Sequence, residues 1–324
     1  MKFRAECCDE VCVSQIEDDW RAANVEDYRS GDRPLLRIRY IGVWDTVGSL
    51  GIPGYLVGAS ISNREYEFHD LKLSRFVESA RHAVAIDERK LDFSPTMWEN
   101  LDDLNAAKGF SAEARDAPYQ QKWFPGNHGS VGGGGDRRGL SDQALDWVWD
   151  GARLAGLRLD TSPNSDIYRL APSDVAPLNN TTEKPNFLDI IGFVIDKLPV
   201  GDRHPGPRQL HEVSVGARRR WHQKPDDLPE HAAYRPPTLA PVQGLLDALN
   251  PSDLGIGSPA PTGQFKMHEV AKGETLSAIA VLHYHDVQEW PRIFEANKYK
   301  IDDPDKIYVG QVLRIPDLPK PPGS

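Results

Sequence analysis

Residues 35–44, with the sequence LLRIRYIGVW, form an apolar run rich in β-branched and aromatic residues, which predicts a largely buried strand. The run stops at Asp45 and is followed by a loop whose signals are Gly48, Gly51, Pro53 and Gly54. A carboxylate in this place lies at the carboxyl end of a strand, where open α/β folds put their binding and catalytic groups. The alternative is that Asp45 only caps the turn that follows it.

Two later segments have the apolar spacing of amphipathic helices. In residues 71–86 the apolar positions recur every three or four residues, at Leu73, Phe76, Val77, Ala80 and Val84. In residues 140–157 we expect Ser141 to be the N-cap and Gly156 to end the helix. The inner stripe of this second helix is predicted to be Leu145, Val148, Trp149 and Ala152. The alternation of strand and helix favours an α/β layer.

Residues 160–240 are rich in proline, asparagine and charge, and we expect irregular covering structure, or a lid, on the same domain. Arg218, Arg219 and Arg220 are interpreted as a solvated helix end; the alternative is a contact with anionic lipid headgroups. Residues 241–264 are rich in glycine, serine and proline and are predicted to be a linker.

Residues 267–316 predict a small separate unit with the order strand, helix, helix, strand. Thr275 is the expected N-cap of the first helix, whose inner face is Leu276, Ile279 and Ala280. Pro291 places the start of the second helix near Glu289, because proline is tolerated in a first turn.

Composition and charge narrow the possible classes of protein. No apolar run approaches the roughly 20 residues that span a bilayer, and the first 20 residues lack the pattern of a signal peptide, so cytoplasmic synthesis is expected. The net charge of -10 argues against a nucleic-acid-binding protein. The three cysteines, Cys7, Cys8 and Cys12, are odd in number and imply no disulfide framework. We expect reduced thiols there and no metal site, and the sequence assigns them no role.

The stretch KWFPGNHGSVGGGG, residues 122–135, predicts a short aromatic strand, a turn, His128 and then a glycine-rich loop. An aspartate at one strand end followed by a histidine at a later one is the chain order of the last two members of an α/β-hydrolase triad. Asp45 and His128 are 128 - 45 = 83 residues apart, which leaves room for intervening structure. We therefore predict that the two side chains form a pair; the alternative is a structural histidine.

Three motifs in residues 267–316 resemble the LysM family: V-x-x-G-E-T-L-x-x-I-A, W-P-R-I-F-E-A-N and I-Y-V-G-Q-V-L-R-I-P. The resemblance implies a βααβ fold that binds glycans containing N-acetylglucosamine, such as peptidoglycan. It also implies a groove between residues 273–276 and residues 300–307, with candidate glycan-binding residues Gly273, Glu274, Thr275, Leu276, Ile301 and Asp302. Alternatively the unit is a spacer or a protein-contact domain, with Leu276 part of its core.

Three further motifs, GVWDTVGSLGIP, ARHAVAIDERK and WFPGNHGSVGGG, resemble the catalytic domain of type VI secretion phospholipase effectors, an α/β-hydrolase family. The resemblance covers about residues 5–240. It implies that Asp45 orients the base, that His128 is the general base and acid, and that no metal or organic cofactor is needed. Family members commonly have an acidic residue where Ser130 stands here.

The family's nucleophile, a serine in a G-F-S-R-G elbow upstream of the aspartate motif, has no counterpart, because no G-x-S-x-G occurs in these 324 residues. Neither Ser14 nor a cysteine lies in a glycine-flanked turn that would expose it as a substitute. We therefore expect an inactive chain, either a gene fragment or a protein that has lost its activity.

Together these patterns predict a mixed α/β protein: a partial α/β-hydrolase-like domain at 1–240, a linker at 241–264, a LysM domain at 265–317 and a tail at 318–324. The expected function is that of a phospholipase or esterase effector with a peptidoglycan-binding module. The alternative is a non-catalytic cell-wall-binding or secretion-adaptor protein. Expected partners are peptidoglycan, a phospholipid substrate for an active form, a type VI spike protein and an immunity protein, with export to a target-cell periplasm.

Overall fold

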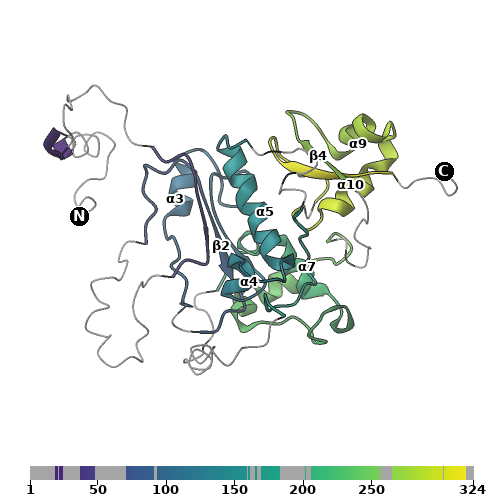
Figure 1. Cartoon of the computed structure of the whole chain (residues 1–324), viewed down its shortest axis with the longest axis horizontal. Helices are drawn as coiled ribbons and strands as arrows, with labels where there is room; N and C mark the ends of the chain where they lie inside the picture. Colours follow the sequence, from purple (N-terminus) through teal and green to yellow (C-terminus); the bar gives the residue numbers. More distant parts are fainter. Residues whose placement is uncertain are drawn as a thin grey trace.

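The computed structural model describes residues 19–20, 22–24, 37–47, 71–90, 93–158, 160, 165, 169–182, 201, 206–254, 256, 265–301 and 303–318 (Figure 1). The three cysteines lie outside these ranges. Within them, no helix is long and apolar enough to cross a membrane.

A parallel sheet of three strands forms the centre of the first domain. Its order is β1 (Ile41–Trp44), β2 (Ala80–Ala85) and β3 (Tyr119–Phe124). Helices α4 (His128–Gly132) and α5 (Gly139–Leu154) cover one face, where Ala83, Phe124 and Val148 are buried. The fold is mixed α/β, as predicted, whereas the α/β-hydrolase fold itself stays a prediction.

The opposite face of the sheet is covered mainly by residues 206–254. These include η4 (Leu210–Glu212), α7 (Val215–His222), η5 (Pro225–Asp227), η6 (Pro237–Val242) and α8 (Gln243–Asp247). Trp123 and Trp221 are the largest side chains of the core between them. Val242 and Leu246, within the segment predicted to be linker, are also buried in this core, so folded structure continues past residue 240. Helix α3 (Leu101–Ala106) packs beside β3.

The predicted helix at 71–86 is wrong, because its second half is the central strand β2. All six residues of β2 are buried, and a parallel strand covered on both faces shows no alternation of apolar and polar positions. The helical spacing of the small and apolar residues in this run is therefore a coincidence and does not indicate a helix. Residues 35 and 36 of the strand predicted at 35–44 lie outside the described residues. In the rest of it the strand is Ile41–Trp44, with one isolated bridge between Ile38 and Val77.

Helix α5 begins earlier than predicted. Ser141 is not the N-cap, since its hydroxyl lies inside the first turn and donates to the carbonyl of Arg138 (3.0 Å). Gly156, at φ 102°, does end the helix. Val148 and Ala152 are buried as predicted, but Leu145 and Trp149 are only half-buried. Three carboxylates at four-residue spacing are buried instead, those of Asp142, Asp146 and Asp150.

The arginine run of α7 is not a solvated helix end, because its three guanidinium groups are buried and tie loops together. Arg218 donates to the carbonyls of Val213 and Leu210, and Arg219 pairs with Asp174 at 3.3 Å. Arg220, with no exposed surface, donates to Asp174 and Ala176 and pairs with Glu230 at 2.5 Å. These guanidinium groups are turned into the fold and away from solvent, which leaves them unsuited to bind lipid headgroups.

The C-terminal module has the predicted βααβ order: β4 (Phe265–Glu269), α9 (Leu276–Tyr284), α10 (Trp290–Asn297) and β5 (Val312–Pro316), with the 3-10 turn η7 (Val287–Glu289) between the helices. Strands β4 and β5 are antiparallel. Thr275 is the N-cap, its hydroxyl accepting from the Ala278 amide (3.1 Å). Every residue of the module's hydrophobic core comes from the module itself.

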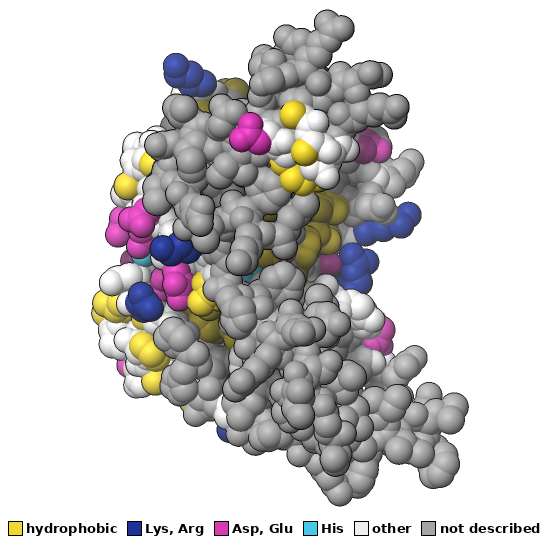
Figure 2. Space-filling model, turned by 90° about the vertical axis from the view of Figure 1, so that its left-hand side faces the viewer, with side chains coloured by type: hydrophobic (Ala, Val, Ile, Leu, Met, Phe, Trp, Pro, Cys, Tyr) yellow, Lys and Arg dark blue, Asp and Glu magenta, His cyan; other side chains and the backbone are white. Residues whose placement is uncertain are grey.

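The side of the molecule on the left of Figure 1 shows hydrophobic side chains among both acidic and basic ones (Figure 2). The described part of this face therefore carries charges of both signs.

Candidate functional site

Asp45 follows β1 and is fixed beside β2 by its backbone and its side chain. Its amide donates to the carbonyl of Ala83 (2.7 Å), and its Oδ1 accepts from the amide of Ala85 (2.8 Å). Its backbone is left-handed, with φ 40°, a conformation that aspartate tolerates better than most residues. The side chain has no exposed surface, and because Oδ1 is bonded to Ala85, the orientation of the other oxygen, Oδ2, is fixed.

His128 is placed by the sharp turn that ends β3. Gly126 has φ 110°, and a Cβ there would lie 2.5 Å from the Cβ of Ser130, so the turn requires glycine. Asn127 is the N-cap of α4, its Oδ1 accepting from the amide of Ser130 (2.8 Å). His128 is therefore the first residue of a short helix, directly above the carboxyl end of β3.

The two side chains meet as the sequence predicted. Nδ1 of His128 lies 2.7 Å from Oδ2 of Asp45, and the histidine side chain is 40% exposed. Because a carboxylate only accepts, the Nδ1–H donates to it, and in the neutral ring Nε2 is then the acceptor. The alternative in which Asp45 caps a turn and His128 points elsewhere is wrong. That this pair is catalytic stays a prediction.

The carboxyl end of β2 supports the His128 turn through two more acidic residues. Oδ2 of Asp87 accepts from the amide of Gly126 (2.7 Å) and from the hydroxyl of Tyr234 (2.8 Å), and burial raises the pKa of Asp87. Glu88 accepts from the amide of His128 (3.3 Å). Sequence reasoning missed both residues, although they stand in the ARHAVAIDERK motif at the end of a buried strand.

His82 also holds the site and was missed, because the segment was interpreted as helix. It is buried in β2, where its Nε2 lies 3.2 Å from the amide of Thr46 and its Nδ1 lies 3.0 Å from Oε1 of Gln121. The amide can only donate, so Nε2 accepts and Nδ1–H donates to Gln121. His82 therefore fixes the residue that follows Asp45.

Among the described residues, no hydroxyl or thiol forms a hydrogen bond with His128; its ring contacts are Asp45 and the ring of Phe93, 5.2 Å away. The hydroxyl of Ser130 donates to the carbonyl of Leu178 (2.5 Å) and to Asn127, so it serves the turn. Ser14, like the cysteines, lies outside the described residues. The described site thus contains a histidine whose ring is held by a buried carboxylate.

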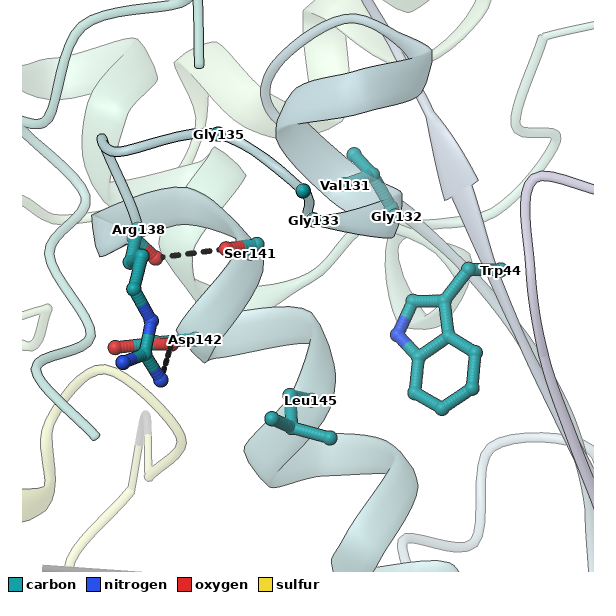
Figure 3. A pocket seen from close by; sticks show the side chains of 10 residues that line it. Trp44, Val131, Gly132, Gly133, Gly135, Arg138, Ser141, Asp142 and Leu145 are labelled. Atoms are coloured by element: carbon teal, nitrogen blue, oxygen red, sulfur yellow. Dashed lines mark hydrogen bonds and ion pairs between the residues drawn. The ribbon is translucent and has the colours of Figure 1, made fainter. Parts of the chain in front are cut away.

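A pocket of about 250 Å³ lies between Trp44, the end of α4 and the first turns of α5 (Figure 3). Gly132, Gly133, Gly134 and Gly135 form one wall with backbone alone. The opposite wall carries Leu145 and the ion pair of Arg138 with Asp142 (3.2 Å). Trp44 directly precedes Asp45, but neither Asp45 nor His128 lines the pocket. Among the described residues, no group of three or more histidine, cysteine or acidic side chains could hold a metal ion.

In the C-terminal module, the candidate glycan residues divide into exposed and buried ones. Gly273 and Thr275 are exposed, and Oε2 of Glu274 accepts from the amide of Ala271 (2.7 Å) and from Nε2 of His268 (2.9 Å). Leu276 and Ile301 are buried in the core, so only their backbone could meet a ligand. Asp302 lies outside the described residues.

Comparison with known proteins finds a matching family model for a segment of each of the two units. Residues 8–151 match the family model described as T6SS, Phospholipase effector Tle1-like, catalytic domain, and residues 268–316 match the LysM domain model. The chain is 50% identical over 60 residues to the potassium binding protein Kbp of Escherichia coli O6:H1, which is 18% of this chain and 39% of that protein. The chain thus spans about two fifths of the length of this relative. Residues 8–151 are thus similar to the catalytic domains of Tle1-like phospholipase effectors of type VI secretion, and residues 268–316 are similar to LysM domains.

Proposed function

We propose that the first domain carries the base half of a serine-type acyl-ester hydrolase whose substrate class is phospholipid. The observation that carries the proposal is the 2.7 Å contact between Nδ1 of His128 and the fully buried Asp45. A histidine held by a buried carboxylate on one ring nitrogen, with the other nitrogen left as acceptor, is the arrangement that activates a serine hydroxyl. The family match of residues 8–151 supports phospholipid as the substrate class.

In this mechanism Nε2 of His128 takes the proton of the nucleophile's hydroxyl as the hydroxyl oxygen attacks the ester carbonyl. Asp45 holds the ring in the required tautomer and stabilises the imidazolium that forms. The protonated ring then gives its proton to the leaving alcohol, and an acyl-enzyme remains for water to hydrolyse. In both half-reactions the proton passes through Nε2 of His128, first from the nucleophile to the leaving alcohol and then from the attacking water back to the nucleophile.

We further propose that these 324 residues are inactive by themselves, because they contain no G-x-S-x-G elbow. The purified chain should hydrolyse p-nitrophenyl acyl esters and phospholipid vesicles no faster than its His128→Ala variant. Turnover that the variant abolishes would contradict this proposal and would show that another group of the chain is the nucleophile.

A fusion tests the hydrolase proposal directly. The elbow-bearing segment of a Tle1-like effector, joined ahead of this chain, should give ester hydrolysis that His128→Ala removes. A fusion with its elbow serine changed to alanine is the matched control. A folded fusion that stays inactive would contradict the proposed role of the Asp45 and His128 pair.

For the LysM domain we propose binding to N-acetylglucosamine glycans, peptidoglycan included, through residues 273–276 and 300–307. The family match supports this assignment. Residues 265–318 have a core of their own, so they can be produced alone and tested for retention on peptidoglycan. A folded module that is not retained would leave only a spacer or protein-contact role.

The second candidate function is a non-catalytic cell-wall-binding or secretion-adaptor protein, which the missing elbow together with the LysM match favours. It expects peptidoglycan binding by the full chain and no esterase activity in the fusion. In either case we propose export by type VI secretion to a target-cell periplasm, with a spike protein and an immunity protein as partners.

A further inference from the structure

The LysM domain is docked on helix α5 of the first domain through a buried ionic contact. Nζ of Lys300 lies 3.0 Å from Oδ2 of Asp146 and 3.7 Å from Oδ2 of Asp150. None of the three side chains is more than 8% exposed. Asp146 and Asp150 are one helical turn apart, so a single ammonium group can lie between their carboxylates.

Further contacts between α5 and the module lie around this ion pair. Arg153 at the end of α5 pairs with Glu269 (2.7 Å) and donates to the carbonyl of Gly310 (2.5 Å). The hydroxyl of Tyr308 lies 3.5 Å from Oδ2 of Asp150, and burial, with a further contribution from Asp150, raises the pKa of Tyr308 to about 12. These contacts come from the end of β4 and from the segment that leads into β5. The module lies beside α5 in the overall view (Figure 1).

Two contacts extend the interface beyond α5. Arg314 of β5 donates to the carbonyl of Leu170 (2.7 Å), and Arg115, in the loop before β3, donates to the carbonyl of Lys306 (3.4 Å). The first domain therefore contacts residues 300, 306, 308 and 310 of the module, which include both ends of the predicted second glycan loop.

The first glycan loop has a different environment. A Cβ placed on Gly273 would meet no heavy atom within 4 Å, and Lys272 and Thr275 are exposed. The first loop is therefore open at these residues. In the second loop the side chain of Lys300 is buried against α5 and the carbonyl of Lys306 accepts from Arg115, although the Lys306 side chain itself is exposed.

The charges make this docking specific for a carboxylate surface. Burial opposes the charge of Lys300, but Asp146 and Asp150 outweigh it and raise the pKa of the lysine above its ordinary value. An ammonium left in this interface without the carboxylates would be a buried unpaired charge, which is strongly unfavourable. Removing the carboxylates should therefore release the module and return Lys300 to water.

We propose that helix α5 and glycan compete for the second loop of the LysM domain, so that the docked module binds glycan weakly and release exposes the full binding surface. The inference rests on the proposed glycan-binding function. The occupant of the module's Lys300 face is thus the first domain of the same chain, and glycan displaces it.

Three proteins test the competition, with chitohexaose as the soluble probe and calorimetry as the measurement. They are the full chain, its Asp146→Asn/Asp150→Asn variant and the isolated residues 265–318. We expect the full chain to bind about tenfold more weakly than the isolated module, within the range of ordinary coupling between sites. The double variant should bind like the isolated module, because it alters α5 and leaves the module's own residues unchanged.

The matched control is Asp102→Asn/Asp103→Asn, which removes the same charge from two exposed residues of α3 and should bind like the unchanged chain. A zero-length carbodiimide crosslink between Lys300 and Asp146, mapped by peptide analysis, reports docking without any glycan. It should form in the unchanged chain and in the control; the double variant lacks the reacting carboxyls, so its docking state is measured by its glycan affinity alone.

The outcomes separate this inference from the function on which it rests. If the isolated module binds and the full chain binds equally well, the competition is wrong and the glycan-binding proposal stands. If the crosslink does not form in the unchanged chain, the docking in solution is wrong. If the folded isolated module binds neither chitohexaose nor peptidoglycan, the glycan-binding proposal fails and the competition with it.

Discussion

At the scale of single residues, Asp45 combines a left-handed backbone with a carboxylate whose two oxygens have separate partners. Oδ1 accepts from the Ala85 amide, and Oδ2 accepts from His128. The contact between Asp45 and His128 could be predicted from the sequence, because each residue follows a short apolar run and precedes a glycine-rich loop. The role of His82 could not be predicted, since its hydrogen bonds to Thr46 and Gln121 depend on the strand register.

Changing Asp45 to asparagine should invert the tautomer of His128. The asparagine oxygen can still accept from Ala85, which turns the amide N–H group toward Nδ1, so Nδ1 must accept and the ring proton moves to Nε2. Ring nitrogen chemical shifts of labelled protein at neutral pH would measure the change. Asp87→Asn, which alters a neighbouring carboxyl that does not contact the ring, should leave the tautomer as it is. An unchanged tautomer in Asp45→Asn would contradict the assigned hydrogen bond.

At the scale of elements, the sequence predicts best where one face of an element is exposed. The module's helices alternate buried and exposed residues, and their order and caps were predicted. Strand β2 is buried on both faces, so its residues do not alternate between apolar and polar. The spacing of its apolar residues with those before it predicts a helix, which is wrong. On α5 the buried Asp146 and Asp150 were missed, because an acidic position on a helix is normally solvated and their partner Lys300 is about 150 residues away.

The turn between β3 and α4 should tolerate no side chain at Gly126. Its φ of 110° and the 2.5 Å approach to the Cβ of Ser130 mean that Gly126→Ala both strains the backbone and forces the helix away. We expect a loss of about 2 kcal/mol or more in the free energy of unfolding, measured by urea denaturation. Gly132→Ala is the matched control, because a Cβ there meets nothing within 4 Å and should be neutral or stabilising. Equal stability of the two variants would contradict the described turn.

At the scale of the whole molecule, the two units have separate hydrophobic cores and meet through polar and charged contacts. The cores around the sheet contain no residue of the module, and the module's core contains none of the first domain. Apolar burial therefore does not couple the two units. Each unit can respond to solution conditions by itself.

Acidification should lower the stability of the module. Nε2–H of His283 donates to Nδ1 of His268 (3.1 Å), and Nε2–H of His268 donates to Glu274 (2.9 Å), a chain in which Nδ1 of His268 must be unprotonated to accept. Burial, together with His268 and Lys266 and against the opposing charge of Glu274, lowers the pKa of His283 below 6.5. The unfolded module thus binds more protons than the folded one near this pH, and stability falls as the pH falls through 6.5.

The measurement is urea denaturation of the full chain at pH 7.5 and 5.5, followed by the amide signals of residues 265–318 in NMR spectra. We expect the module's transition to move to lower urea at pH 5.5. His283→Gln keeps an N–H group that can donate to His268 but does not titrate, so its transition should move less. The pKa of Glu274 is lowered from 4.5, chiefly by its hydrogen bond from the Ala271 amide, so that group remains ionised at both pH values. A module more stable at pH 5.5, or a variant with the same pH response as the unchanged chain, would show that the histidine chain does not control this stability.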